Sequence, residues 1–160
     1  MLKNFFTKIV NILKRFLLFL PGLHFFRKSA VFEDTGRWGE KIAENFLRNN
    51  HYKILGRRIR AGKHGELDIV AKDGDVLVFV EVKTRKTENY GRPISAVNFW
   101  KKKALSRAAI AYLKRLNYPQ IYFRFDVVEV VGSPGNSEPV IRHIKDAFKL
   151  SSWYYYPRNS

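Results

Sequence analysis

Three acidic residues and a lysine stand on two neighbouring apolar segments, at a spacing that suits metal-assisted chemistry. Glu66 and Asp68 belong to the segment GELDIVA, and Glu81 and Lys83 belong to VLVFVEVKT. Residues 72–75 join the two segments and contain Asp-Gly, a strong signal for a β-hairpin. Directly paired residues of a hairpin share one face of the sheet, so an even loop places all four side chains together.

The loop decides whether this group of side chains exists. A loop centred between Asp73 and Gly74 would pair Glu66 with Glu81 and would place Asp68 diagonal to Glu81. An odd loop would put Asp68 and Glu81 on opposite faces of the sheet and would separate the group. We predict the even register.

Carboxylates crowded on one face repel each other unless a cation compensates them. Mg²⁺ (or Mn²⁺) prefers oxygen ligands, and a bound ion lowers the pKa of its water and stabilises charge on a phosphate. Lys83 would orient or deprotonate that water, or neutralise a phosphoryl oxygen. Glu40, at the border of an apolar helix face, could reach the same site. The alternative is a solvated sheet face on which Lys83 pairs with Glu81.

The rest of the chain supplies elements that could position this group. Apolar periodicity predicts a helix over residues 35–50, and a second helix follows Pro93 and extends to about residue 117. Trp100 is expected on the inward face of the second helix, with Leu105 and Tyr112. The remaining patterns predict strands over residues 51–60, 122–131 and 140–144, and a short helical end over 146–150. This order favours an α/β sandwich.

The amino-acid composition limits the classes of binding partner and of catalytic site that are expected. The 160 residues contain 30 Lys plus Arg against 14 Asp plus Glu, a net charge of +16, which favours a polyanionic partner. Cysteine is absent, which excludes a disulfide scaffold, a thiolate zinc site and cysteine catalysis. The sequence contains no P-loop and no dinucleotide-binding fingerprint.

The N-terminal segment differs from the rest. Residues 1–32 hold six basic groups and no acid, and residues 3–15 have the pattern of an amphipathic helix. The apolar stretch 16–20 ends at Pro-Gly and is too short to span a bilayer. We predict an interfacial helix over residues 3–20 that binds an anionic membrane surface. A helix packed on the domain and a signal or anchor segment are the alternatives.

The motifs together are more specific than any of them alone. GELDIVA, the hairpin and FVEVKTR resemble the PD-(D/E)XK nuclease signature. The wider pattern resembles the YraN family of uncharacterised, predicted endonucleases, which are similar in core to archaeal Holliday junction resolvases. The resemblance covers roughly residues 34–150. Its further pieces are Gly36-x-x-Gly39-Glu40, Tyr90-Gly91, Ala96-Val97, Lys101, Ala109, RFDVV at 124–128 and IKDAF at 144–148.

The resemblance implies a restriction-endonuclease-like α/β core, with a mixed central sheet flanked by helices in the order α-β-β-β-α-β. It implies metal ligands at Asp68 and Glu81, a catalytic lysine at Lys83 and an auxiliary acid at Glu40. Glu66 belongs to the family motif and is the third candidate metal ligand. The domains expected are an extension over residues 1–32, a nuclease-like domain over 33–150 and a tail over 151–160.

Two positions depart from the family pattern. Arg58 stands where the family usually has Asn, and Ser95 stands where it often has an acid. Neither is a proposed metal ligand, so the departures bear on local positioning or on substrate choice.

Basic residues on the second helix and after the second hairpin strand are candidates for nucleic-acid contact. A solvated helix face is the alternative for the lysine run. We interpret Arg124 and Asp126, which also match the family, as a structural ion pair. The nucleic-acid-binding candidates are Arg85, Lys101, Lys102, Lys103 and Arg107.

The leading functional hypothesis is a metal-dependent endonuclease that hydrolyses phosphodiester bonds in DNA, including branched or damaged DNA. By analogy with junction-cutting enzymes, it would act as a homodimer. Its expected location is the cytoplasm, with peripheral attachment at the inner face of the membrane through residues 3–20. The alternatives are a non-catalytic nucleic-acid-binding protein on a nuclease fold and a membrane-associated adaptor.

Overall fold

The computed structural model describes residues 30–61, 65–87, 98–135, 138–150 and 154. Chain contacts divide the protein into two units, Met1–Ala30 and Val31–Ser160. The amphipathic segment predicted over residues 3–20 lies outside the described residues, as do Tyr90-Gly91, Ser95 and most of the tail. Within the described part, no helix is long and apolar enough to cross a membrane.

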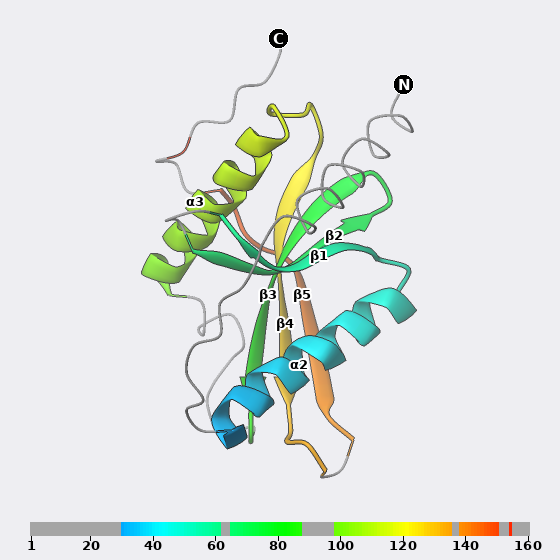
Figure 1. The fold of residues 1–160 in the computed structure, drawn as a ribbon. Coiled ribbons are helices and arrows are strands. Elements are labelled where there is room, and N and C mark those ends of the chain that lie inside the picture. The colour runs from blue at the N-terminus through cyan, green and yellow to red at the C-terminus, as the bar shows by residue number, and fades with distance from the viewer. Residues whose placement is uncertain (1–29, 62–64, 88–97, 136–137, 151–153, 155–160) are drawn as a thin grey trace, which may run out of the picture. The chain divides into compact units, whose positions relative to one another are not determined.

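One five-stranded sheet forms the centre of the second unit (Figure 1). Its strands lie in chain order, β1-β2-β3-β4-β5. The β3–β4 pair is parallel and the other three pairs are antiparallel, so the sheet is mixed, as the resemblance implied. The elements are α2 (Ala30–Asn49), β1 (Lys53–Arg60), β2 (Glu66–Asp73), β3 (Val76–Arg85), α3 (Phe99–Arg115), β4 (Phe123–Val131) and β5 (Val140–Phe148).

The two helices cover opposite faces of this sheet (Figure 1). The face of α3 that carries Leu105, Ala109 and Leu113 packs on one apolar cluster of the sheet. The face of α2 that carries Ala43 and Leu47 packs on the other. Parallel neighbours need a crossover connection, and α3 lies within the one that joins β3 to β4. This arrangement confirms the predicted α/β class.

The predicted helical end over residues 146–150 is wrong, because β5 continues to Phe148. The backbone NH of Asp146 donates to the Asp126 carboxylate at 2.9 Å, and Phe148 stacks on Phe125 with ring centroids 4.6 Å apart. Asp146 has φ +51, a left-handed conformation that Asp tolerates better than most residues. These contacts to β4 hold the segment in the sheet.

The predicted inward position of Trp100 is also wrong, because this side chain is 71% exposed. The buried face of α3 is centred near Leu105 and Tyr112. At about 100° per residue, Trp100 lies about 140° from Leu105 around the helix, whereas Lys101 lies about 40° from it. The helix therefore turns Lys101 toward the sheet and Trp100 away from it.

Candidate active site

The hairpin register brings the predicted acids together, but not by the predicted pairing. The paired residues include Ile69 with Val80 and Asp73 with Val76, which leaves a two-residue turn in which Gly74 has φ +56. Two-residue hairpin turns favour such left-handed glycines, so the turn is centred one residue later than expected.

The pairing of Glu66 with Glu81 is consequently wrong. One step beyond the last observed pair, this register places Asp68 opposite Glu81. The loop is still even, so the predicted sharing of one face by Asp68 and Glu81 holds.

Glu81 is the centre of the site. Its side chain is 2% exposed on β3, and its Oε1 accepts from Lys83 Nζ at 2.7 Å and from Lys101 Nζ at 2.9 Å. Its Oε2 is buried and has no hydrogen-bond partner among the residues that the structure describes. A buried carboxylate oxygen without a partner is costly and requires an explanation.

Lys101 reaches this carboxylate from α3, the element that covers this face of the sheet. The first turn of α3 is held by Asn98, whose side chain accepts from the backbone NH of Lys101 at 2.9 Å. The sequence marked Lys101 for nucleic-acid contact, and the structure places its ammonium group beside Glu81. The helical phase relative to Leu105 is the signal that identifies this inward position.

Asp68 lies next to Glu81. Its Oδ2 accepts from the backbone NH of Val82 at 2.8 Å. Burial, followed by the negative charge of Glu81, raises the pKa of Asp68 to about 7, although the Val82 hydrogen bond and the charge of Lys101 oppose the shift. Two acids thus share a region in which the positive charges present do not fully compensate them.

Glu40 approaches the same acids from α2. Burial raises the pKa of Glu40, the charge of Arg58 partly offsets this, and the charge of Glu40 in turn raises the pKa of Asp68. Close helix–sheet contact at Gly39 sets its position: a Cβ there would lie 1.9 Å from the Oγ1 of Thr84 on β3. Glycine in the Gly-Glu pair therefore lets α2 approach the strand that carries Glu81.

Glu66 is engaged elsewhere. Its carboxylate pairs with Arg58 at 3.1 Å and with Arg60 at 3.6 Å, and Arg58 also lies 3.9 Å from Glu40. Arg58 has φ +47, a conformation that Asn adopts more readily than Arg. The arginine thus links two acids at the edge of the site, from a backbone position that suits the usual family residue.

The donor set suits a hard cation that keeps some of its waters. Among the described residues, no three or more His, Cys, Asp or Glu side chains are grouped so as to hold a metal ion. Mg²⁺ is commonly held by one or two carboxylates, with substrate phosphates and waters completing its octahedron. The unpartnered Oε2 of Glu81 and the raised pKa of Asp68 both fit such an ion, which would relieve the burial cost of each.

The remaining basic candidates fall into two groups. Arg107 is exposed and Lys102 and Lys103 are partly exposed on α3, as a nucleic-acid surface would require. Arg85 is mostly buried, with its Nε 3.1 Å from Glu129, and Arg142 lies 3.1 Å from the other oxygen of that carboxylate.

Glu129 is a buried acid that was not predicted from the sequence. It is fully buried on β4 and pairs in register with Lys83 on the face that α3 covers. A glutamate inside the apolar run of β4 was the signal that could have identified it.

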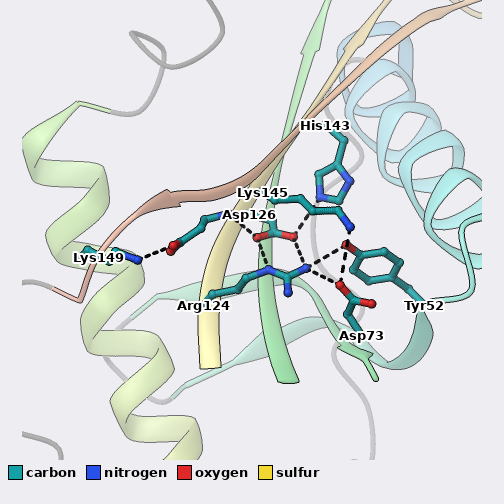
Figure 2. Close-up of polar contacts among 8 residues, drawn as sticks. Tyr52, Asp73, Arg124, Asp126, His143, Lys145 and Lys149 are labelled. Carbon is teal, nitrogen blue, oxygen red and sulfur yellow. Dashed lines mark hydrogen bonds and ion pairs between the residues drawn. The ribbon is translucent and has the colours of Figure 1, made fainter. Parts of the chain in front are cut away.

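The pair Arg124–Asp126 belongs to a separate polar network (Figure 2). Arg124 Nε lies 2.9 Å from Asp126 Oδ1, and its Nη2 lies 2.7 Å from Asp73 and 2.9 Å from the Tyr52 hydroxyl. His143 Nε2 lies 2.9 Å from Asp126 Oδ2. The interpretation of Arg124 and Asp126 as a structural ion pair agrees with these contacts.

The negative charge of Asp126 is compensated by hydrogen bonds, whereas that of Asp68 is not fully compensated. Burial by itself would raise the pKa of Asp126, but hydrogen bonds from His143, Arg124 and the Asp146 backbone NH outweigh it and lower the pKa below the usual value. This carboxylate is stabilised in its charged form.

Comparisons with known proteins agree with the motifs. Residues 39–130, which include the site residues from Glu40 to Lys101, match the model of the uncharacterised protein family UPF0102. The chain belongs to this family. UPF0102 is the YraN family that the motifs indicated.

Individual UPF0102 proteins align with this chain over most of their own length. A UPF0102 protein of Clostridium kluyveri is 41% identical over 128 residues, which are 80% of this chain and 100% of the relative. One from Geotalea daltonii is 46% identical over 116 residues, 72% of this chain and 90% of the relative. One from Clostridium tetani is 44% identical over 118 residues, 74% of this chain and 96% of the relative. Their names state no activity.

Proposed function

We propose that the protein is a metal-dependent endonuclease that hydrolyses phosphodiester bonds in DNA. The observation that carries this proposal is the buried carboxylate of Glu81 beside Asp68, whose pKa is raised. Within the described part of the chain, Oε2 of Glu81 has no hydrogen-bond partner. A purely structural ion pair would have both oxygens satisfied, as Asp126 does. Perturbed acids next to fixed lysines are typical of sites that bind a further charged group.

The position of each residue suggests its role in the proposed reaction. Glu81 and Asp68 would hold Mg²⁺ or Mn²⁺, which when bound supplies positive charge to the reacting phosphate and lowers the pKa of a water. Lys83 and Lys101 both contact Oε1 of Glu81, and their ammonium groups would neutralise charge on phosphate oxygens. The charge of Glu40 acts on Asp68, and Glu40 would orient the attacking water.

The charge of the chain supports DNA as the substrate. The net charge of +16 favours a polyanion, and α3 carries Lys102, Lys103 and Arg107 beyond the site lysine. Phosphate contacts of this kind gather nucleic acid without reading its sequence.

The test is cleavage of labelled duplex, flap, single-stranded and four-way-junction DNA by the full chain, with Mg²⁺, Mn²⁺ or EDTA. We expect metal-dependent cutting that Glu81→Gln reduces by at least about 10²-fold, because the substitution removes charge with little change of shape. Asp75→Asn, an exposed turn acid, is the matched control and should cut normally. Tight binding without cutting of any substrate would contradict the enzyme and favour the non-catalytic binding protein.

A further inference from the structure

Two large aromatic side chains stand exposed at the beginning of α3. Phe99 is 58% exposed and Trp100 is 71% exposed, and their rings form an edge-to-face pair with centroids 5.4 Å apart. Exposed aromatics in such a cluster mark a binding surface more often than scattered ones do.

This pair directly precedes a residue of the candidate active site in the first turn of α3. The next residue, Lys101, has its Nζ 2.9 Å from Glu81, and Lys103 Nζ lies 5.8 Å from the centre of the Trp100 ring. The first turn of α3 contains no acidic residue. Cations near a helix N-terminus oppose the helix dipole, and an anion bound there would relieve that opposition.

We propose that Phe99 and Trp100 stack on unpaired bases of a nucleic acid whose phosphate lies at Lys101 and Glu81. This inference rests on the proposed function and names its substrate class: DNA with an unpaired segment beside the scissile phosphate. In a continuous duplex the flat faces of the bases are covered by their neighbours, so protein rings stack on them only where the strand is single or a base is extruded.

Charge favours a nucleic acid over an apolar partner on this surface. The two rings lie next to Lys101, Lys102 and Lys103 in the chain, and an apolar protein surface would bring no negative charge to this basic turn. A strand of nucleic acid brings a phosphate for each base, so it matches the aromatic rings and the lysines at once. Proteins that bind single strands combine a basic track with aromatic platforms in this way.

The binding experiment uses the full chain in EDTA, with a labelled single strand and a blunt duplex of the same length compared by fluorescence anisotropy. Trp100→Ala should weaken binding of the single strand by about 5- to 100-fold, the range expected for one lost stacking contact. It should change duplex binding by less than about twofold. Tyr122→Ala removes an aromatic ring that is 81% exposed on another part of the surface, and it should leave both affinities unchanged.

A second readout separates stacking from a structural role of the ring. Trp100→Phe keeps a flat ring and should restore most of the single-strand affinity that Trp100→Ala loses. Single strands should quench tryptophan emission of the wild-type chain, and the quenching should be smaller in Trp100→Phe. Equal loss of duplex and single-strand binding in Trp100→Ala, or no loss of either, would overturn the inference.

Failure of this inference and failure of the proposed function give different results. Because binding is measured in EDTA, it does not depend on cleavage. Selective loss of single-strand binding in a protein that cuts nothing would support stacking and contradict the nuclease. Cleavage of DNA that Trp100→Ala leaves unchanged, with unchanged binding, would support the nuclease and overturn stacking.

Discussion

Two buried acids, Asp126 and Glu81, lie on neighbouring strands but on opposite faces of the sheet, and their hydrogen bonding differs. Val80 of β3 pairs with Asp126 of β4, and the next pair is Glu81 with Val127. Because faces alternate along a strand, Asp126 points to the side covered by α2 and Glu81 to the side covered by α3. Asp126 accepts from several donors, whereas one oxygen of Glu81 has no partner in the described ranges of the chain.

The contrast separates an acid whose charge the fold stabilises from acids that, under the proposed function, would hold a metal ion. Hydrogen bonds lower the pKa of Asp126, so its charged form is stabilised by the folded protein. Burial and the charge of Glu81 raise the pKa of Asp68, so the folded protein disfavours the charged form of this side chain. A satisfied network rigidifies a protein, and an incompletely satisfied one is typical of a site that functions with a further component.

The largest effect on stability is predicted for a substitution of Asp126, the acid whose hydrogen bonds are satisfied. Asp126→Ala removes the acceptor of His143 and of the Asp146 backbone NH, and leaves Arg124 with Asp73 and Tyr52 only. It should lower the free energy of unfolding by about 3–5 kcal/mol. Urea unfolding measures this change. The folded fraction of the variant should retain the cleavage rate of the wild-type chain, because Asp126 faces away from Glu81.

A pH series checks the cause of that loss. The pKa of Asp126 is lower in the folded than in the unfolded chain, so its contribution is full above about pH 4 and disappears as the pH falls through the lowered pKa. The difference between wild type and Asp126→Ala should therefore shrink in acid. A constant difference over the whole range would assign the loss to packing and not to charge.

The second prediction moves the helix that carries Glu40. Gly39→Ala would place a Cβ 1.9 Å from Thr84 Oγ1 and 2.9 Å from Thr84 Cβ, both on a paired strand that cannot yield easily. Overpacking of this kind should cost about 1–3 kcal/mol of stability and should displace Glu40 from the acids of the site. Thermal or urea unfolding, with cleavage measured in parallel, tests both consequences.

Gly36→Ala is the matched control for this change. A Cβ at Gly36 would meet nothing within 4 Å, and Ala is favoured over Gly inside a helix by about 1 kcal/mol. This variant should therefore be as stable as the wild type or more so. Equal effects of the two substitutions would show that the contact of Gly39 with Thr84 does not set the position of α2.

Local patterns were sufficient for the strands and for the shared face of Asp68 and Glu81. Alternation and the Asp-Gly signal predicted the hairpin, and every even loop gives the same grouping of faces. Local patterns did not predict the exact pairing of residues. A turn at Gly74 and Asp75, as observed, and a turn at Asp73 and Gly74 both fit the local sequence.

Long-range contacts decided the features that the sequence did not predict. Residues 146–148 join the sheet because Asp146 and Phe148 find partners on β4, which no local pattern in that segment reveals. Trp100 was assigned to the core because it is apolar, whereas the phase of α3 set by Leu105 places Lys101 inward instead. A helical wheel centred on the best apolar run would have corrected the second error.

The last prediction concerns the pH dependence of stability that the raised pKa of Asp68 should cause. In EDTA, folded Asp68 has a pKa of about 7 against an ordinary value near 4, so the folded protein holds a proton that the unfolded chain has released. Wild-type stability should fall as the pH rises from about 4 to about 7, opposite in sign to the Asp126 effect. Asp68→Asn removes this fall and should be more stable than wild type by at least about 1 kcal/mol near pH 8, with little difference near pH 4. The same advantage at both pH values would mean that Lys101 already compensates an ionised Asp68, and the contrast between the two faces of the sheet would then rest on Glu81 alone.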